Sequence, residues 1–123
     1  MSDPNFVILY VNDPPASAVF YADLLGHPAI ESSPTFCMFA LASGVMLGLW
    51  KRNMVLPEAT SAVGGAELAF ALDGIDAVRA THADWKQRGL TIAQSPTAMD
   101  FGYTFVALDP DGHRLRVFAP SGA

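Results

Sequence analysis

The chain has 123 residues, of which 51% are hydrophobic and 15% are charged, so we expect one folded domain with an apolar core. Its net charge is −5, and its seven Lys and Arg residues form no stripe, which argues against nucleic acid as a partner. No apolar run approaches the roughly 20 residues that span a bilayer. The N-terminus lacks a basic stretch ahead of an apolar one. The only cysteine is Cys37, which excludes an intrachain disulfide. We therefore expect a cytoplasmic protein with no membrane partner.

The first elements are a strand and a helix. Phe6–Val11 is a continuous apolar run rich in aromatic and β-branched residues, which predicts a buried strand. Asp13 is a suitable N-cap and Pro14 suits a first helical turn. From 16 to 25 the apolar residues recur with the spacing of one helix face. Gly26 then predicts the end of the helix.

Three strands and a connection follow. The strands are predicted at about His27–Glu31, Thr35–Leu41 and Val45–Trp50, and Ser43-Gly44 indicates a tight turn between the last two. The segment from 51 to 65 has few periodic apolar residues and ends in two glycines. It is therefore interpreted as a linker.

The same order of elements then returns. A strand, a helix and three further strands are predicted at Glu67–Leu72, Ile75–Arg88, Leu90–Ala93, Tyr103–Leu108 and His113–Phe118. The Asp109-Pro110-Asp111-Gly112 sequence predicts the last turn. The chain thus contains two βαβββ modules, about 5–51 and about 66–120, joined by a linker over 52–65. This internal repeat predicts an α+β fold.

The repeat is accompanied by two motifs. Val11-Asn12-Asp13 followed by Phe20-Tyr21-Ala22-Asp23-Leu24-Leu25-Gly26, and Asp109-Pro110-Asp111-Gly112-His113 near the end, resemble the opening and closing signatures of the vicinal oxygen chelate superfamily. This group includes glyoxalase I, extradiol dioxygenases and bleomycin-resistance proteins. The resemblance covers about 6–120. It implies two βαβββ modules whose curled mixed sheets surround an open cavity, and it implies a homodimer.

The resemblance also assigns the positions of the superfamily's metal ligands. They correspond to Phe6, Gly48, Glu67 and Arg116 in this sequence. Only Glu67 has a side chain that ligates a metal, because a phenyl ring offers no lone pair and a guanidinium is a cation. A catalytic metal normally needs three protein ligands. We therefore expect neither a metal nor another cofactor, and no metal-dependent catalysis.

The remaining nucleophiles and bases do not indicate another active site. The three histidines share no ligand-like spacing. Cys37 lies in an apolar run, as a packed cysteine does. No serine stands in a nucleophile-elbow sequence.

Aromatic and charged residues at these positions predict a binding cavity. The candidate ligand-binding residues are Phe6, Phe39, Gly48, Trp50, Glu67, Phe101, Tyr103 and Arg116. Flat apolar walls suit a planar aromatic ligand. Arg116 either binds an acidic group of that ligand or forms a salt bridge with Glu67. That salt bridge could lie within one chain or across a dimer interface.

Within the superfamily, the most similar group is the phenazine-antibiotic resistance binding proteins. The segments that match are Leu47–Trp50, Gly64–Leu68 and Asp109–Val117. This resemblance implies sequestration of an aromatic toxin without chemistry. Two alternatives remain at this stage. One is an enzyme, either a metal-dependent lyase or dioxygenase with unusual ligands or a metal-free isomerase with Glu67 as base. The other is a vestigial or regulatory dimer whose cavity is filled by its own side chains.

Overall fold

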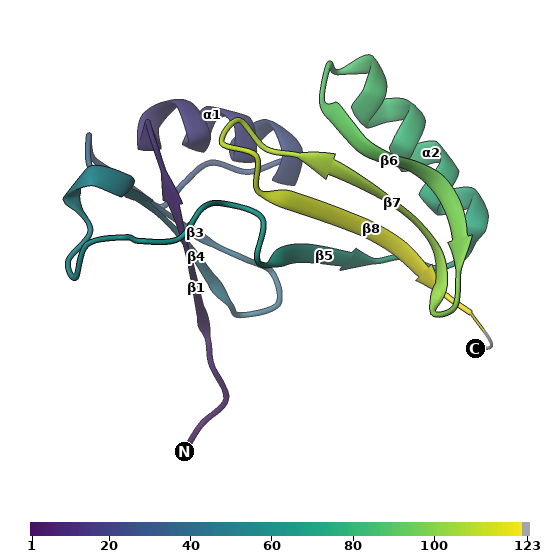
Figure 1. Ribbon diagram of the computed structural model, residues 1–123, viewed down its shortest axis with the longest axis horizontal. Helices are drawn as coiled ribbons and strands as arrows, with labels where there is room; N and C mark the ends of the chain where they lie inside the picture. The colour runs from purple at the N-terminus through teal and green to yellow at the C-terminus, as the bar shows by residue number, and fades with distance from the viewer. Residues whose placement is uncertain (122–123) are drawn as a thin grey trace. The chain divides into compact units, whose positions relative to one another are not determined.

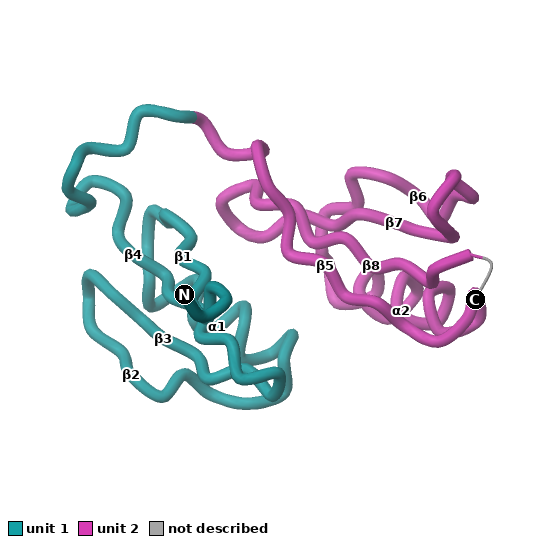
Figure 2. Tube along the Cα trace, turned by 90° about the horizontal axis from the view of Figure 1, so that it is seen from below, with its two compact units in different colours: residues 1–61 teal, residues 62–123 magenta. Residues whose placement is uncertain are grey.

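The computed structural model describes residues 1–121, which form two compact units (Figure 2). The first unit runs from Met1 to Ser61, and the second begins at Ala62. Each unit contains one βαβββ module, as the internal repeat predicts. The division falls inside the predicted linker. None of the helices in these 121 residues is long and apolar enough to cross a membrane.

The first unit is a four-stranded mixed sheet with one helix against it (Figure 1). Its elements in chain order are β1 (Phe6–Val11), α1 (Pro14–Leu25), β2 (Glu31–Ser32), β3 (Phe36–Ala40), β4 (Met46–Lys51) and the 3-10 turn η1 (Arg52–Met54). The strand order is β1-β4-β3-β2, with β1 parallel to β4 and the other pairs antiparallel.

The predicted ends of α1 are confirmed. The Asp13 side chain accepts a hydrogen bond from the backbone N–H of Ala16 at 3.2 Å. Gly26 has φ of +81° and donates its N–H to the carbonyl of Ala22. Only glycine adopts this left-handed backbone at no steric cost, so the helix ends there.

The second unit repeats the arrangement. Its elements are β5 (Glu67–Ala71), α2 (Ile75–Gln87), β6 (Thr91–Met99), β7 (Gly102–Leu108) and β8 (Arg114–Pro120). The strand order is β5-β8-β7-β6, again with the first strand parallel to the last. Neither sheet is closed, and the fold is α+β as predicted.

Two strands differ from their predicted ranges. β2 has only two residues that pair with β3, and His27 and Pro28 lie before it. β6 extends to Met99 although it contains Pro96. An edge strand tolerates proline because the missing N–H faces no partner strand, and register shifts between Ile92 and Thr97 absorb the irregularity.

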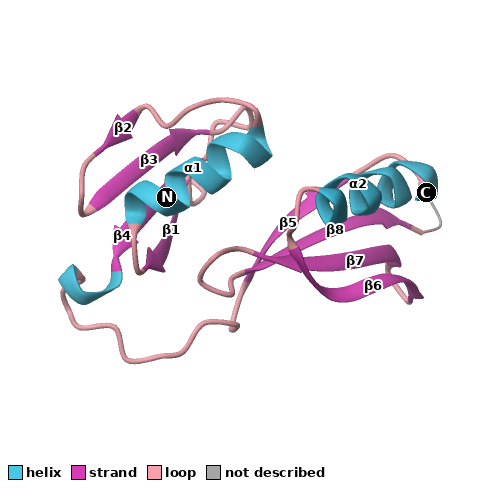
Figure 3. Cartoon of the chain, turned by 90° about the horizontal axis from the view of Figure 1, so that it is seen from above, coloured by secondary structure: helices cyan, strands magenta, loops and turns pink. Residues whose placement is uncertain are grey.

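Each sheet has one face against its helix and one face away from it (Figure 3), which we call the open face. Along β8, Leu115, Val117 and Ala119 are buried and alternate with more exposed residues. On β7, the Phe105 ring contacts the rings of His82 and Trp85 of α2. The helix face therefore forms the core of the unit, and the alternate residues of each strand belong to the open face.

Candidate ligand-binding site

The open face of the second sheet has a bidentate ion pair. Arg116 on β8 donates from Nε to Oε1 of Glu67 at 2.7 Å and from Nη2 to Oε2 at 3.0 Å. The two residues meet because β5 runs parallel to β8, with Ala69 in register with Arg116. Two parallel N–H bonds fix the orientation of both groups. The sequence left this pairing open; the structure shows that it forms within one chain.

The remaining contacts of Arg116 anchor it from the other side. Its Nη1 donates to Oγ1 of Thr104 at 3.2 Å and to Oε1 of Gln94 at 3.3 Å. The Thr104 hydroxyl in turn donates to the carbonyl of Val117 at 2.9 Å. Four of the five N–H groups of a guanidinium are thus used. The Arg116 side chain is 18% exposed and held from three directions.

Arg114 lies two residues earlier on the same face of β8. Its Nη1 is 3.7 Å from Oε2 of Glu67, beyond hydrogen-bond distance. Half of the Arg114 side chain is exposed, against 29% for Glu67. Arg114 therefore has a longer and weaker contact with Glu67 than Arg116 has, and its side chain is the more exposed of the two.

An aromatic pair lies next to these charges. The rings of Phe101 and Phe118 meet edge to face, with centroids 5.9 Å apart. The guanidinium of Arg116 stands over the Phe101 ring at 5.7 Å, within the range of a cation–π contact. Phe101 lies in the turn between β6 and β7 and is 44% exposed. This face therefore presents an aromatic surface bordered by cations.

The Arg116 guanidinium holds the pKa of the Glu67 carboxyl below its usual range. The hydrogen bonds from Arg116 are the largest cause, partial burial opposes them, and the charges of Arg116 and Arg114 lower the pKa further. A lowered pKa means that the charged form is favoured by folding. Glu67 is thus a carboxylate across the physiological pH range.

This lowered pKa predicts an acid-dependent loss of stability. The contribution of Glu67 is fully present above the pKa of an unfolded glutamate, about 4.3, and is lost as the pH falls through the lowered folded value. We expect Glu67→Gln to have a lower free energy of unfolding than the wild type at pH 7, and this difference to shrink toward pH 3. Urea unfolding of both proteins across this range measures it. A difference independent of pH would contradict the assignment.

The open face of the first sheet gathers aromatic rings. Phe6 and Trp50, two predicted ligand-binding residues, lie on this face. The antiparallel register places Phe36 opposite Trp50, and the Tyr10 ring meets the Trp50 ring edge to face at 6.3 Å. A Cβ on Gly48 would lie 3.0 Å from the Phe36 ring and 3.4 Å from the Phe6 ring. Glycine at 48 therefore makes room for two rings of the protein itself.

Phe36 is a site residue that the sequence analysis missed. The signal was present, since Phe36 has the strand parity opposite to Phe39 and the Ser43-Gly44 turn fixes the register with Trp50. Gln94 and Thr104 were also missed. Gln94 follows a register shift in β6, so its direction does not follow from simple alternation.

The structure does not bring two predicted residues to the open faces. Phe39 is fully buried on the helix face and its ring contacts His27. Tyr103 also lies on the helix side, where its hydroxyl accepts from Nε of Arg79 of α2 at 3.3 Å. Alternation along β3 and β7 turns both side chains away from the faces that hold Trp50 and Arg116. The open faces therefore retain Phe6, Gly48 and Trp50 in one unit and Glu67, Phe101 and Arg116 in the other.

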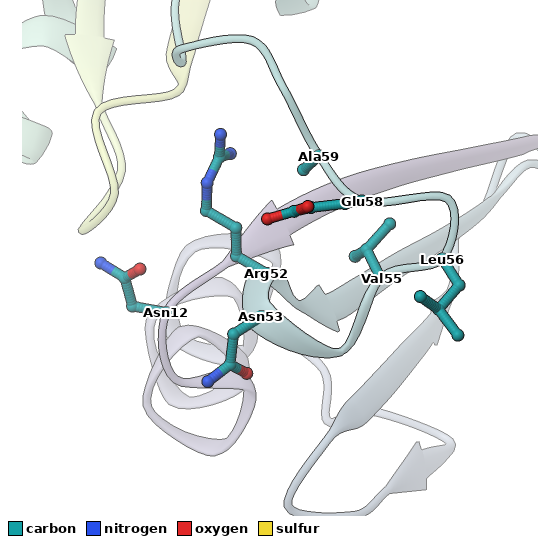
Figure 4. Close-up of a pocket in the computed structure, with 7 residues that line it drawn as sticks. All are labelled: Asn12, Arg52, Asn53, Val55, Leu56, Glu58 and Ala59. Carbon is teal, nitrogen blue, oxygen red and sulfur yellow. The ribbon is translucent and has the colours of Figure 1, made fainter.

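A separate pocket of about 450 Å³ lies in the first unit where β1 ends and η1 begins (Figure 4). It is lined by Asn12, Arg52, Asn53, Val55, Leu56, Glu58 and Ala59. Arg52 donates a hydrogen bond to the carbonyl of Ser61, which holds the connecting segment. The pocket contains none of the predicted ligand-binding residues.

The residues at the superfamily's metal positions do not fit a divalent metal ion. Both oxygens of Glu67 accept from Arg116, and the other positions hold a phenyl ring, a glycine and the guanidinium itself. Within residues 1–121, no three His, Cys, Asp or Glu side chains are grouped as metal ligands would be. Two of the four positions, Glu67 and Arg116, instead form an ion pair with each other.

Comparisons with known proteins match this architecture. The chain is 24% identical over 118 residues to the phenazine antibiotic resistance protein EhpR of Enterobacter agglomerans, covering 93% of this chain and 89% of that protein. The solution NMR structure of protein ATC0852 from Agrobacterium tumefaciens is 53% identical, with a TM-score of 0.91 over 99% of this chain and 100% of that one. A glyoxalase/bleomycin resistance protein/dioxygenase family enzyme from Burkholderia phytofirmans shares the fold, at 23% identity, a TM-score of 0.78, and coverage of 97% and 99%.

The family itself is shown by a match along nearly the whole chain. The model of the Glyoxalase/Bleomycin resistance protein/Dioxygenase superfamily matches residues 4–117, which include the first βαβββ module, most of the second and both motifs. The chain belongs to the Glyoxalase/Bleomycin resistance protein/Dioxygenase superfamily.

Proposed function

We propose that this protein binds a planar aromatic small molecule and sequesters it without chemical conversion. The observation that carries the proposal is the exposed Phe101 ring, held between Phe118 and the anchored guanidinium of Arg116. Edge-to-face and stacked aromatic contacts each add about 0.5–1.5 kcal/mol beyond burial. The rings of Phe6, Phe36 and Trp50 give the first unit a similar surface. The distant similarity to a phenazine antibiotic resistance protein supports this ligand class.

The ion pair favours binding over catalysis. A general base near neutral pH needs a pKa close to the working pH and a lone pair directed at the substrate. Glu67 has a lowered pKa, and both its oxygens accept hydrogen bonds from Arg116. These contacts weigh against Glu67 as the base of a metal-free isomerase. We extend the proposal to a cytoplasmic homodimer, as the family resemblance implies.

Tryptophan fluorescence tests the proposal. The protein has two tryptophans: Trp50 on an open face and Trp85, 7% exposed, packed between Phe70 and Phe105. We expect phenazine to quench the fluorescence saturably, and Phe101→Ala, which removes the exposed ring of the second unit, to weaken this response. The titration is corrected for phenazine absorbance with free N-acetyltryptophanamide.

Recovery of the ligand separates binding from turnover. Phenazine incubated overnight with a tenth of its molar amount of protein should be recovered unchanged by mass spectrometry. An absence of saturable quenching, or a converted product, would overturn the proposal.

A further inference from the structure

We infer that the ligand is an aromatic carboxylate and that Arg114, rather than Arg116, is the residue that binds its anionic group. This inference rests on the proposed function and specifies the ligand class and the specificity-determining residue of the same surface. Three independent features of the second unit support it: the charge of the open face, the hydrogen-bonding capacity of its two arginines, and the position of the aromatic rings.

The open face of the second sheet has an excess positive charge. Among the alternating residues of β5 to β8 that share this face, the charged ones are Glu67, Arg114 and Arg116. One carboxylate against two guanidiniums leaves a formal charge of +1. The whole chain carries −5, so this local excess is opposite in sign to the protein. A neutral aromatic ligand would not use this charge, whereas an anionic ligand would neutralise it.

Arg114 and Arg116 differ in how many N–H groups they have left to donate to a ligand. Arg116 already donates four N–H groups to Glu67, Gln94 and Thr104, so a ligand acid would have to displace Glu67. Arg114 has only the 3.7 Å approach to Glu67, and half of its side chain is exposed. Its planar fork matches both oxygens of a carboxylate. Arg114 therefore binds the anion, and the Glu67–Arg116 pair is a fixed support beneath the aromatic surface.

The spacing along β8 suits a ligand with an acid at one end. Arg114, Arg116 and Phe118 follow at intervals of two residues, about 6.6 Å apart. Phe101 covers the Arg116 and Phe118 end of this row. A fused-ring ligand on Phe101 places a ring carboxylate toward Arg114. Along β8 the open face therefore presents the exposed Arg114 first, then Arg116 paired with Glu67, and then the ring of Phe118.

Calorimetry with two matched probes tests the inference. Phenazine and phenazine-1-carboxylate share the ring system and differ by one negative charge at pH 7. We expect wild-type protein to bind the carboxylate about tenfold more tightly than phenazine, as one charge-assisted interaction allows. Arg114→Gln should bring the ratio of the two affinities close to one, and Arg114→Lys should restore part of the preference for the carboxylate. Arg79→Gln is the control, because Arg79 is an exposed arginine of the same unit that stacks on Tyr103 on the helix side.

A second variant checks the role of the support. Glu67→Gln removes the competing negative charge and leaves Arg116 one amide oxygen in place of two carboxylate oxygens, so carboxylate affinity should rise several-fold. The outcomes separate the two proposals. If neither probe binds, the proposed function and the inference both fail. If phenazine binds but the carboxylate binds no better, or if Arg114→Gln keeps the preference, the inference alone is wrong.

Discussion

Phe105→Ala is expected to lower the free energy of unfolding by about 3–5 kcal/mol. Phe105 is fully buried on the helix face of β7, and its ring packs edge to face with His82 at 5.2 Å and with Trp85 at 5.5 Å. Truncation leaves a cavity between sheet and helix that the surrounding strands fill only in part. Urea unfolding followed by circular dichroism measures the loss.

Phe101→Ala is the matched control, since it removes the same ring from the open face. Phe101 is 44% exposed, so its truncation should cost less than about 1.5 kcal/mol. It should weaken phenazine binding, whereas Phe105→Ala should retain binding in its folded fraction. Equal destabilisation by the two substitutions would contradict the assignment of helix face and open face.

Gly102→Ala is expected to destabilise the second unit by about 3 kcal/mol or more. Gly102 begins β7 with φ of +151°, and an added Cβ would overlap the backbone carbonyl oxygen of Ala119 on β8. Relief requires movement of one strand against the other, because the obstacle is backbone and not a flexible side chain. Phe101 immediately precedes Gly102, so the aromatic surface should move as well.

Gly26→Ala separates the steric effect from the general cost of positive φ. Gly26 has φ of +81° with no atom within 4 Å of the position of a Cβ. Its replacement should cost only about 1–2 kcal/mol. Thermal unfolding measures the stability of Gly102→Ala and of Gly26→Ala. A phenazine titration of each folded variant shows whether the aromatic surface has moved. A Gly102→Ala protein as stable as Gly26→Ala would show that β7 and β8 are not so closely packed there.

Together these variants distinguish residues that bind ligand on the open faces from residues that stabilise the fold. Every binding residue that we propose belongs to an open face, whereas the core residue Phe105 packs against α2. The distinction matters for phenylalanine, because Phe39 and Phe105 are buried in strands against a helix, whereas Phe101 lies in the turn between β6 and β7 and is 44% exposed. A surface of rings that are not needed for stability is what a binding protein requires.

Several features follow from the sequence alone. The doubled strand–helix–strand order, the ends of α1 at Asp13 and Gly26, and the central strands of both sheets are encoded locally, by apolar periodicity and by residues with particular backbone preferences. The sequence alone also shows that Phe6, Gly48 and Arg116, which the resemblance assigns to metal-ligand positions, lack side chains that ligate a metal. Strand parity further gives the common face of Arg114 and Arg116.

Only the tertiary structure decided which of these residues meet. Glu67 and Arg116 are 49 positions apart, and the parallel pairing of β5 with β8 brings them within 2.7 Å. The register shifts in β6 place Gln94 on Arg116, and alternation turns Tyr103 toward Arg79. Periodicity fixes how a side chain faces relative to its own strand, but contacts between distant segments depend on register, bulges and the side on which the helix packs. For this reason the sequence left two roles open for Arg116, binding an acidic ligand or pairing with Glu67. The folded sheet pairs Arg116 with Glu67 and leaves half of the Arg114 side chain exposed beside them.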